Sequence, residues 1–323
     1  MKYLGSMDLS IGLLFLACVH TAMCANVTTD PSNYFSNING NLTKIVWAHA
    51  VNSKAELSKA LASDSVMMLE ADVVLGKWNS SENQNVNETI PVMAHPPATE
   101  SDLSLEKFVS GVNEKNATKG VKLDFKSIEA FNASKSILDK LLHDLKFPVF
   151  LNADILAGPV NATATPVDAK AFLALAKPYR NCTVSVGWTT RYGTKDNVTE
   201  GGYTEEQIKK MIDTLKEQNV TQPITYPVRA GLAANDISVI KSLMEKSSDM
   251  KNVTLTVWSS EGDKVDAAKL STLIKDIGVT KVYVDVPEDL MKSLQLSGSS
   301  SGVSVASITL VASLVAVLLS TIL

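Results

Sequence analysis

The chain has 323 residues, of which 45% are hydrophobic and 20% are charged, and its formal net charge is −4. This apolar content excludes a disordered chain, and the mild acidity argues against a nucleic-acid partner, which would require a basic stripe. The length fits one barrel-sized domain or two small ones.

The first 25 residues have the pattern of a secretory signal peptide. Lys2 gives a weakly positive start, an apolar stretch covers residues 11–18, and small residues near 22–25 suit a signal peptidase. Cleavage there would remove Cys18 and Cys24 and leave only Cys182, so we expect no intrachain disulfide. Residues 26–43 form an N-terminal extension before the first expected strand.

The segment from 44 to 292 alternates between apolar, β-branched runs and helical patterns. The expected strands are residues 44–50, 66–75, 120–126, 148–155, 183–190, 223–230, 253–259 and 281–286. The expected helices are residues 53–61, 104–112, 128–145, 168–176, 204–218, 236–246 and 266–277, with a last short one from 287. Eight strands alternating with helices over about 250 residues predict an α/β fold, the (β/α)₈ TIM barrel.

Polar segments interrupt this pattern. Residues 76–89 are rich in asparagine and are expected to form a surface loop after the second strand. Asn-X-Ser/Thr sequons are frequent, which is typical of a secreted glycoprotein. We expect glycosylation at Asn41, Asn79, Asn87, Asn116, Asn132, Asn161, Asn197, Asn219 and Asn252. We do not count on the sequon at Asn181, because burial beside a strand would block it.

The C-terminal residues have the pattern of a GPI attachment signal. Residues 293–302 form a spacer of small residues, with Ser297, Gly298 and Ser299 as candidate attachment sites. Residues 303–323 form an uncharged, apolar tail. The alternative is a plain membrane span, since that tail could cross a bilayer. Either reading predicts the membrane as a partner and a position on the extracellular side of the plasma membrane.

Acidic residues gather where the expected strands end. In a barrel, functional side chains project from the carboxyl ends of the strands, and side chains two apart share a face. Glu70 and Asp72 therefore share a face, as do Asp124 and Lys126. Three carboxylates at one mouth repel unless a cation compensates, and their hard oxygens suit Mg²⁺ or Ca²⁺. The alternative is a mouth without metal, in which Lys126 pairs with the carboxylates.

Two histidines add acid–base chemistry to this mouth. His49 ends the first strand and His95 follows the second, and such a pair can move protons to and from a phosphodiester. A hard cation neutralises phosphate oxygens. Further candidates for substrate or phosphate binding are Lys126, Arg229, Asn152, Asp154, Trp188 and Trp258. The two tryptophans could instead be core residues.

The order His49, Glu70-x-Asp72, His95, Asp124-x-Lys126 resembles the phospholipase C-like phosphodiesterase superfamily, which includes the glycerophosphodiester phosphodiesterases. More closely, the chain resembles the menorin family, the proteins named family with sequence similarity 151, over about residues 44–290. The blocks that carry this resemblance are Trp47-Ala-His-Ala50, Leu69-Glu-Ala-Asp-Val73, Met93-Ala-His-Pro-Pro97, Lys122-Leu-Asp-Phe-Lys126, Leu151-Asn-Ala-Asp154, Val186-Gly-Trp-Thr-Thr190, Pro227-Val-Arg-Ala230 and Thr256-Val-Trp-Ser-Ser260.

The resemblance implies a phospholipase C-like barrel with His49 and His95 as acid–base pair and Glu70, Asp72 and Asp124 as metal ligands. This chain departs from the glycerophosphodiesterases, because Ala50-Val51 stands where they have Arg-Gly and their downstream Glu-Asn-Thr is missing. Arg229 or Lys126 would have to hold the phosphate instead.

Two functions follow as expectations. The first is a cell-surface, metal-dependent phosphodiesterase or lyase that acts on a phospholipid or glycerophosphodiester, with His49 as base and His95 as acid. The second is a non-catalytic, membrane-tethered ligand or co-receptor with extracellular protein partners, as the menorin resemblance and the lost Arg-Gly suggest.

Overall fold

The structure, a computed structural model, describes residues 29–82, 88–114, 118–143 and 146–296. The expected signal peptide, the candidate attachment sites, the apolar tail and the sequons at Asn87 and Asn116 lie outside these residues. Within the described ranges, no helix is long and apolar enough to cross a bilayer.

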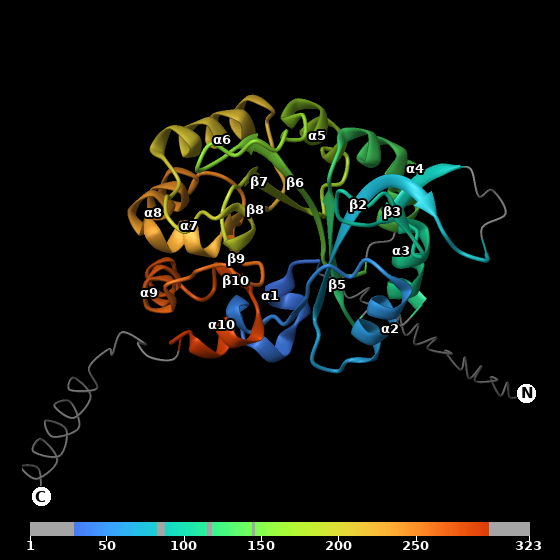
Figure 1. The fold of residues 1–323 in the computed structure, drawn as a ribbon, viewed down its shortest axis with the longest axis horizontal. Coiled ribbons are helices and arrows are strands. Elements are labelled where there is room, and N and C mark those ends of the chain that lie inside the picture. Colours follow the sequence, from blue (N-terminus) through green and yellow to red (C-terminus); the bar gives the residue numbers. More distant parts are fainter. Residues whose placement is uncertain (1–28, 83–87, 115–117, 144–145, 297–323) are drawn as a thin grey trace, which may run out of the picture.

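Eight parallel strands form a nearly closed barrel (Figure 1). They are β1 (Trp47–Ala48), β2 (Met68–Trp78), β5 (Gly120–Phe125), β6 (Val149–Ala157), β7 (Thr183–Thr189), β8 (Ile224–Arg229), β9 (Val253–Trp258) and β10 (Val282–Asp285). Each pairs in parallel with the next, in the order β1-β2-β5-β6-β7-β8-β9-β10. The predicted TIM barrel is therefore confirmed, with all eight strands at their expected places.

Helices cover the outside of the barrel, as the alternation predicts (Figure 1). They are α2 (Lys54–Ala62), α3 (Leu105–Glu114), α4 (Ile128–His143), α5 (Ala169–Ala176), α6 (Glu205–Glu217), α8 (Ile237–Lys246), α9 (Ala267–Ile277) and α10 (Glu288–Ser293). A capping box begins α6: the Gln207 amide donates to Thr204 Oγ1 at 3.2 Å, and the Thr204 amide donates to the Gln207 side chain at 3.0 Å.

Several short elements of the structure are not predicted from the sequence. Residues 230–235, read as the end of a strand and a loop, form helix α7 (Ala230–Asn235). The turns η1 (Ser36–Ile38), η2 (Leu42–Lys44) and η3 (Thr194–Asp196) and the short helix α1 (Pro31–Tyr34) were also not anticipated.

The expected loop at 76–89 is partly wrong. Strand β2 continues to Trp78, and β3 (Thr89–Met93) returns antiparallel to it, while β4 (Glu100–Ser101) pairs with the end of β2. The polar composition of this segment does not indicate a hairpin. The hairpin projects beyond the barrel, where Lys77 and Thr89 face solvent.

Apolar side chains fill the amino end of the barrel and polar ones the carboxyl end. Trp47, Phe150 and Tyr283 meet edge to face inside the barrel, with ring centroids 5.4–6.1 Å apart. Residues of the expected N-terminal extension pack beneath them, with Phe35, Ile38 and Leu42 in the same buried cluster. This apolar cluster fills the amino end of the barrel and leaves the carboxyl end for a functional site. Barrels carry their active sites at that end.

Candidate active site

A cavity of about 490 Å³ opens at the carboxyl ends of the barrel strands. We call it the mouth. Its lining includes every predicted acid–base, ligand and substrate residue except Trp188: His49, Glu70, Asp72, His95, Asp124, Lys126, Asn152, Asp154, Arg229 and Trp258. The strands that supply them are separated by more than 200 residues of sequence, so the fold alone brings the set together.

Three carboxylates form the centre of the mouth. Glu70 and Asp72 lie on the inward face of β2, and Asp72 is in register with Asp124 on β5. One oxygen from each of the three lies within 4.8 Å of the others. Glu70 and Asp72 are only 2% and 4% exposed, so their charges are weakly screened by water.

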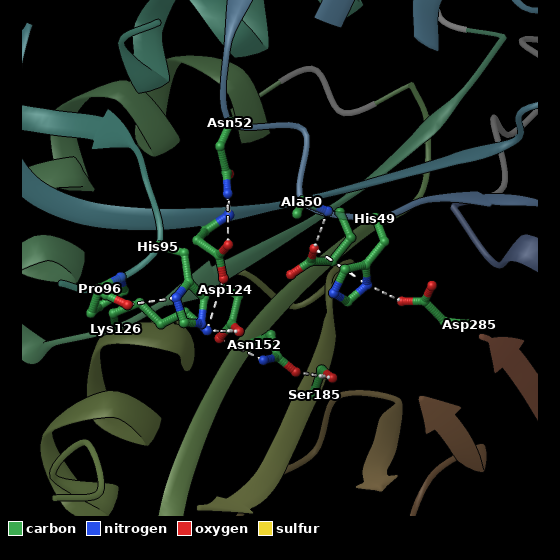
Figure 2. Close-up of polar contacts among 12 residues, drawn as sticks. His49, Ala50, Asn52, His95, Pro96, Asp124, Lys126, Asn152, Ser185 and Asp285 are labelled. Carbon is green, nitrogen blue, oxygen red and sulfur yellow. Dashed lines mark hydrogen bonds and ion pairs between the residues drawn. The ribbon is translucent and has the colours of Figure 1, made fainter. Parts of the chain in front are cut away.

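Neighbouring polar groups fix these carboxylates in place. The Asn52 side chain donates to Asp72 Oδ2 at 2.8 Å and accepts from the Asp72 amide at 2.9 Å. Asn152 Nδ2 donates to Asp124 Oδ1 at 2.7 Å, and the Ser185 hydroxyl donates to Asn152 Oδ1 at 2.6 Å. Figure 2 shows this chain of contacts from Asp124 to Ser185. The carboxylates are therefore held rigidly, as a ligand set must be.

Lys126 lies between two of the carboxylates. Its Nζ is 2.8 Å from Asp72 Oδ1 and 2.5 Å from Asp124 Oδ2. Burial opposes ionisation of Asp124, but the nearby Lys126 and Lys122 charges outweigh it and lower the pKa of that carboxyl. The pairing that the sequence left open as the alternative to a metal is thus formed.

The lysines do not balance all of the negative charge. Burial raises the pKa of Glu70 to about 7, against the charge of His49 and with the help of Asp72. Burial, reinforced by Asp124, likewise raises the pKa of Asp154 to about 7. Both shifts indicate that the mouth resists another negative charge and would favour a further cation.

His49 reaches the cluster from the end of β1. Its Nδ1 lies 2.9 Å from Asp285 Oδ2 and 3.7 Å from Glu70 Oε2. Burial lowers the pKa of His49, but the charge of Glu70 and the bond to Asp285 outweigh this and raise it to about 9. The next residue, Ala50, has a φ of 54°, and its amide donates to Glu70 at 2.9 Å. This strained backbone ties the histidine segment to the carboxylates.

His95 reaches the mouth by way of the hairpin. β3 carries the chain back along β2, and the Ala94 amide donates to the Asp72 carbonyl at 3.0 Å. The exposed His95 ring then places Nδ1 2.7 Å from the Pro96 carbonyl. That contact requires the proton on Nδ1 and leaves Nε2 for substrate chemistry. In Figure 2 His95 lies beside Lys126 and Asp124, while His49 lies toward Asp285.

Arg229 is at the mouth but already has partners. Its Nε and one terminal nitrogen each lie 2.8 Å from an oxygen of Asp263, and the other terminal nitrogen donates to Thr190 at 3.1 Å. The guanidinium also lies over Trp258 and Tyr192, at 5.2 and 5.7 Å from the ring centroids. Holding a phosphate would require Arg229 to give up part of this arrangement.

Comparison with known proteins gives the family. The sequence model described as Menorin N-terminal domain matches residues 41–291. The chain belongs to this family. The human protein described as Protein FAM151B is 37% identical over 246 residues, which cover 76% of this chain and 83% of that protein. The menorin resemblance is thereby confirmed, while the place within the phosphodiesterase superfamily stays a prediction.

Two solved structures show a distant likeness to this menorin-family chain. The GH53 catalytic domain of Ignisphaera aggregans is 12% identical, with 76% of this chain and 84% of that chain covered and a TM-score of 0.41. The GH26 domain of a Prevotella bryantii endo-beta-mannanase/endo-beta-glucanase is 11% identical, with 85% and 96% covered and a TM-score of 0.46. At these scores neither likeness bears on function.

Trp188 does not belong to the mouth of this menorin-family barrel. On β7, Thr183, Ser185 and Thr189 occupy alternate positions, and Ser185 reaches the interior network through Asn152. Trp188 has the opposite parity, is 1% exposed and packs against Tyr203 and Tyr226. The core reading of Trp188 holds, and its reading as a substrate residue is corrected.

The residues of the site that the sequence did not indicate include Asn52, Lys122, Asp263 and Asp285. Asp285 ends the eighth strand, so the rule that found Asp72 and Asp124 could have found it. Lys122 precedes Asp124 by two and shares its face by the same rule. Asn52 and Asp263 lie in loops, where no sequence pattern marked them.

Exposure also differs from the expectation at two sequons. Asn181 is exposed in the structure, as are Asn79, Asn132, Asn161, Asn197, Asn219 and Asn252. Asn41 is half-buried, and its side chain accepts from the Thr43 amide at 3.1 Å. Burial therefore does not block Asn181, and access at Asn41 is poorer than expected.

Proposed function

We propose that the mouth binds a divalent cation and cleaves a phosphodiester, in a phospholipid or a glycerophosphodiester. The observation that carries this proposal is the convergence of Glu70, Asp72 and Asp124 within 4.8 Å, in a cavity that also holds His49 and His95. Buried carboxylates that lie this close are costly unless positive charge offsets them.

The donor set suits a hard cation. Seven carboxylates line the mouth, those of Glu70, Asp72, Asp124, Asp154, Asp196, Glu261 and Asp263, against the cations Lys122, Lys126, Lys195, Arg229 and protonated His49. Without a further cation, this excess of negative charge would repel the negatively charged phosphodiester. Mg²⁺ or Ca²⁺ on Glu70, Asp72 and Asp124 would neutralise the phosphate oxygens and the charge that develops on them. Lys126 would compete with it for Asp72 and Asp124.

The histidines supply the proton transfers. With Nδ1 of His49 held by Asp285, Nε2 is the nitrogen free to take a proton from the attacking hydroxyl or water. The new oxygen–phosphorus bond forms as the bond to the leaving oxygen breaks, and His95 Nε2 gives that oxygen its proton. Attack by a neighbouring hydroxyl of the substrate would yield a cyclic phosphate. A cation on Glu70 would offset the carboxylate charge that keeps His49 protonated, which lets His49 act as base.

We further propose a place on the extracellular side of the plasma membrane. The N- and C-terminal sequence patterns and the exposed sequons support this location. Surface protein that shifts in mass on N-glycan removal and is released by a GPI-cleaving phospholipase is the expected result. Surface protein that resists release would instead support a membrane span.

Calorimetric titration of the purified protein with Mg²⁺ and Ca²⁺ tests the cation. We expect saturable binding that Asp72→Asn abolishes and that Asp213→Asn leaves unchanged, because Asp213 lies on the outer face of α6 and pairs with Lys209. With binding established, His49→Gln and His95→Gln should each slow phosphodiester cleavage by about 10²–10⁴-fold. Unchanged rates in both histidine variants would refute the proposed chemistry.

One observation favours a second function. Lys126 already pairs with Asp72 and Asp124, and Arg229 already pairs with Asp263, so neither cation is free to hold a phosphate. This arrangement suits a non-catalytic, membrane-tethered extracellular ligand or co-receptor that retains an idle site. Absence of binding at millimolar Mg²⁺ and Ca²⁺ would favour this function over catalysis.

A further inference from the structure

A second cavity, of about 640 Å³, lies at the opposite end of the barrel from the mouth. It opens beneath the amino ends of β7, β8, β9 and β10, which are consecutive neighbours in the barrel. Residues 29–32 and Leu42 complete its wall. Barrel enzymes place their chemistry at the carboxyl ends of the strands, so this cavity is suited to binding rather than catalysis.

The lining of this lower cavity is positively charged. Arg180, Lys251 and Lys281 line it, and all three side chains are exposed. Among the described residues, none of the three forms an ion pair. The only lining carboxylate in the described chain is Asp30, which accepts from the amide and hydroxyl of Ser32 at the start of α1. Three cations against one carboxylate leave a net charge of +2.

The charge extends beyond the cavity. A basic residue stands one to three positions before six of the eight barrel strands: Lys44, Lys119, Lys146, Arg180, Lys251 and Lys281. Lys119 is bound to two backbone carbonyls, at 2.6 and 2.7 Å from Ser63 and Val66. Lys44 and Lys146 are exposed, like the three in the cavity. The charged residues just before the barrel strands are thus mainly basic, while the mouth at the carboxyl end is acidic.

The polar lining fits a saccharide. Ser32, Asn181, Thr183, Thr254 and Thr280 line the same cavity and carry hydroxyl or amide groups. Such groups pair with sugar hydroxyls, while a guanidinium and two ammonium groups pair with sulfate oxygens. A cavity of this volume holds a small ligand or one to a few units of a longer chain.

We infer that the lower cavity binds a sulfated polysaccharide, with Arg180, Lys251 and Lys281 holding sulfate groups. An extended chain fits better than a single anion, because the exposed Lys44 and Lys146 carry the positive charge past the cavity. A membrane surface fits worse: insertion requires exposed apolar side chains, and Val46 is the one large hydrophobic side chain exposed in the described part of the molecule. The inference does not depend on the mouth or on catalysis.

Calorimetry with a heparin-derived hexasaccharide tests this inference on the full chain. We expect saturable binding that weakens as sodium chloride is raised, because salt screens exposed charges. The variant Arg180→Gln/Lys251→Gln/Lys281→Gln should bind at least about tenfold more weakly. The matched control Lys59→Gln/Lys170→Gln/Lys210→Gln removes three exposed cations from α2, α5 and α6 and should bind within about twofold of the parent. Equal thermal unfolding midpoints show that both variants are folded.

Three further arms separate the possible occupants. Inorganic sulfate and a desulfated hexasaccharide should both bind much more weakly than the sulfated one, and vesicles with phosphatidylserine should not bind. No binding of the hexasaccharide, equal loss in the control variant, or binding of vesicles alone would overturn the inference.

The sequons at Asn181 and Asn252 line the same cavity, so attached glycans could lie across it. Asn181→Gln/Asn252→Gln should therefore bind at least as well as the glycosylated parent. Binding by that variant alone would show that the chain's own glycans occupy the cavity, and would overturn an external polysaccharide as the occupant.

Discussion

At the scale of single residues, the Arg229–Asp263 pair shows how the mouth is built. The Arg229 and Asp263 side chains are 11% and 1% exposed and are joined by two hydrogen bonds of 2.8 Å. Asp263→Asn would leave a nearly buried guanidinium without its counter-charge. We expect a loss of about 3–5 kcal/mol of stability, measured by urea unfolding. Asp276→Asn, which breaks the exposed Lys241–Asp276 pair, should cost less than about 1 kcal/mol. Similar losses in the two variants would contradict this account.

The same scale shows what the sequence could tell about the site. Period-two alternation on β2 and β5 placed Glu70, Asp72 and Asp124 on one inward face, and the structure bears this out. The same rule applied to β7 and β10 would have moved Trp188 to the outside and added Asp285. Ion pairs between side chains cannot be predicted in this way. Arg229 pairs with Asp263 because of the course of the loop after β9, and no local sequence pattern determines that course.

At the scale of elements, the hairpin of β2 and β3 positions His95, and Gly76 allows its close packing. A Cβ on Gly76 would collide with the backbone carbonyl of Thr99 and lie 3.0 Å from Val92. Gly76→Ala should therefore push β4 from β2 and cost about 1–3 kcal/mol of stability. Thermal and urea unfolding would measure the loss.

Gly111→Ala is the matched control for that element. Its Cβ would meet the flexible Leu57 side chain at 3.3 Å, and alanine is the better helix former in α3. We expect no loss there, or a small gain. If Gly76→Ala were equally harmless, the segment around Thr99 would have room to move and the hairpin would not be closely packed.

The hairpin also marks where sequence reasoning about elements ends. The barrel strands could be predicted from the sequence as β-branched runs, because both of their faces are covered. β3 and the extension of β2 lie outside the barrel. Exposed polar residues there, such as Lys77 and Thr89, give the segment the composition of a loop. Only the tertiary pairing with the buried part of β2 makes them strands.

At the scale of the whole molecule, burial of tyrosines predicts alkaline unfolding. Burial raises the pKa of Tyr226 to about 12 and raises those of Tyr179, Tyr203 and Tyr283 as well. An unfolded chain ionises its tyrosines near pH 10. The folded state favours the neutral phenols, so this stability is complete below pH 10 and is lost as pH rises from there toward the folded pKa values. In that pH window, each buried tyrosine lowers the free energy of unfolding by about 1.4 kcal/mol per pH unit.

We therefore expect phenolate absorbance and circular dichroism to change together, in one steep transition above pH 10. Tyr226→Phe removes one of these groups, so its transition should lie at higher pH once the two proteins are matched for stability at pH 7. That matching is needed because Tyr226 and Ser247 share a 3.0 Å hydrogen bond that the variant loses. Absorbance that rises gradually around pH 10 while the circular dichroism stays native would mean that solvent reaches these phenols. The layer between the barrel strands and their covering helices would then be looser than the packing of Tyr203 and Tyr226 against Trp188 implies.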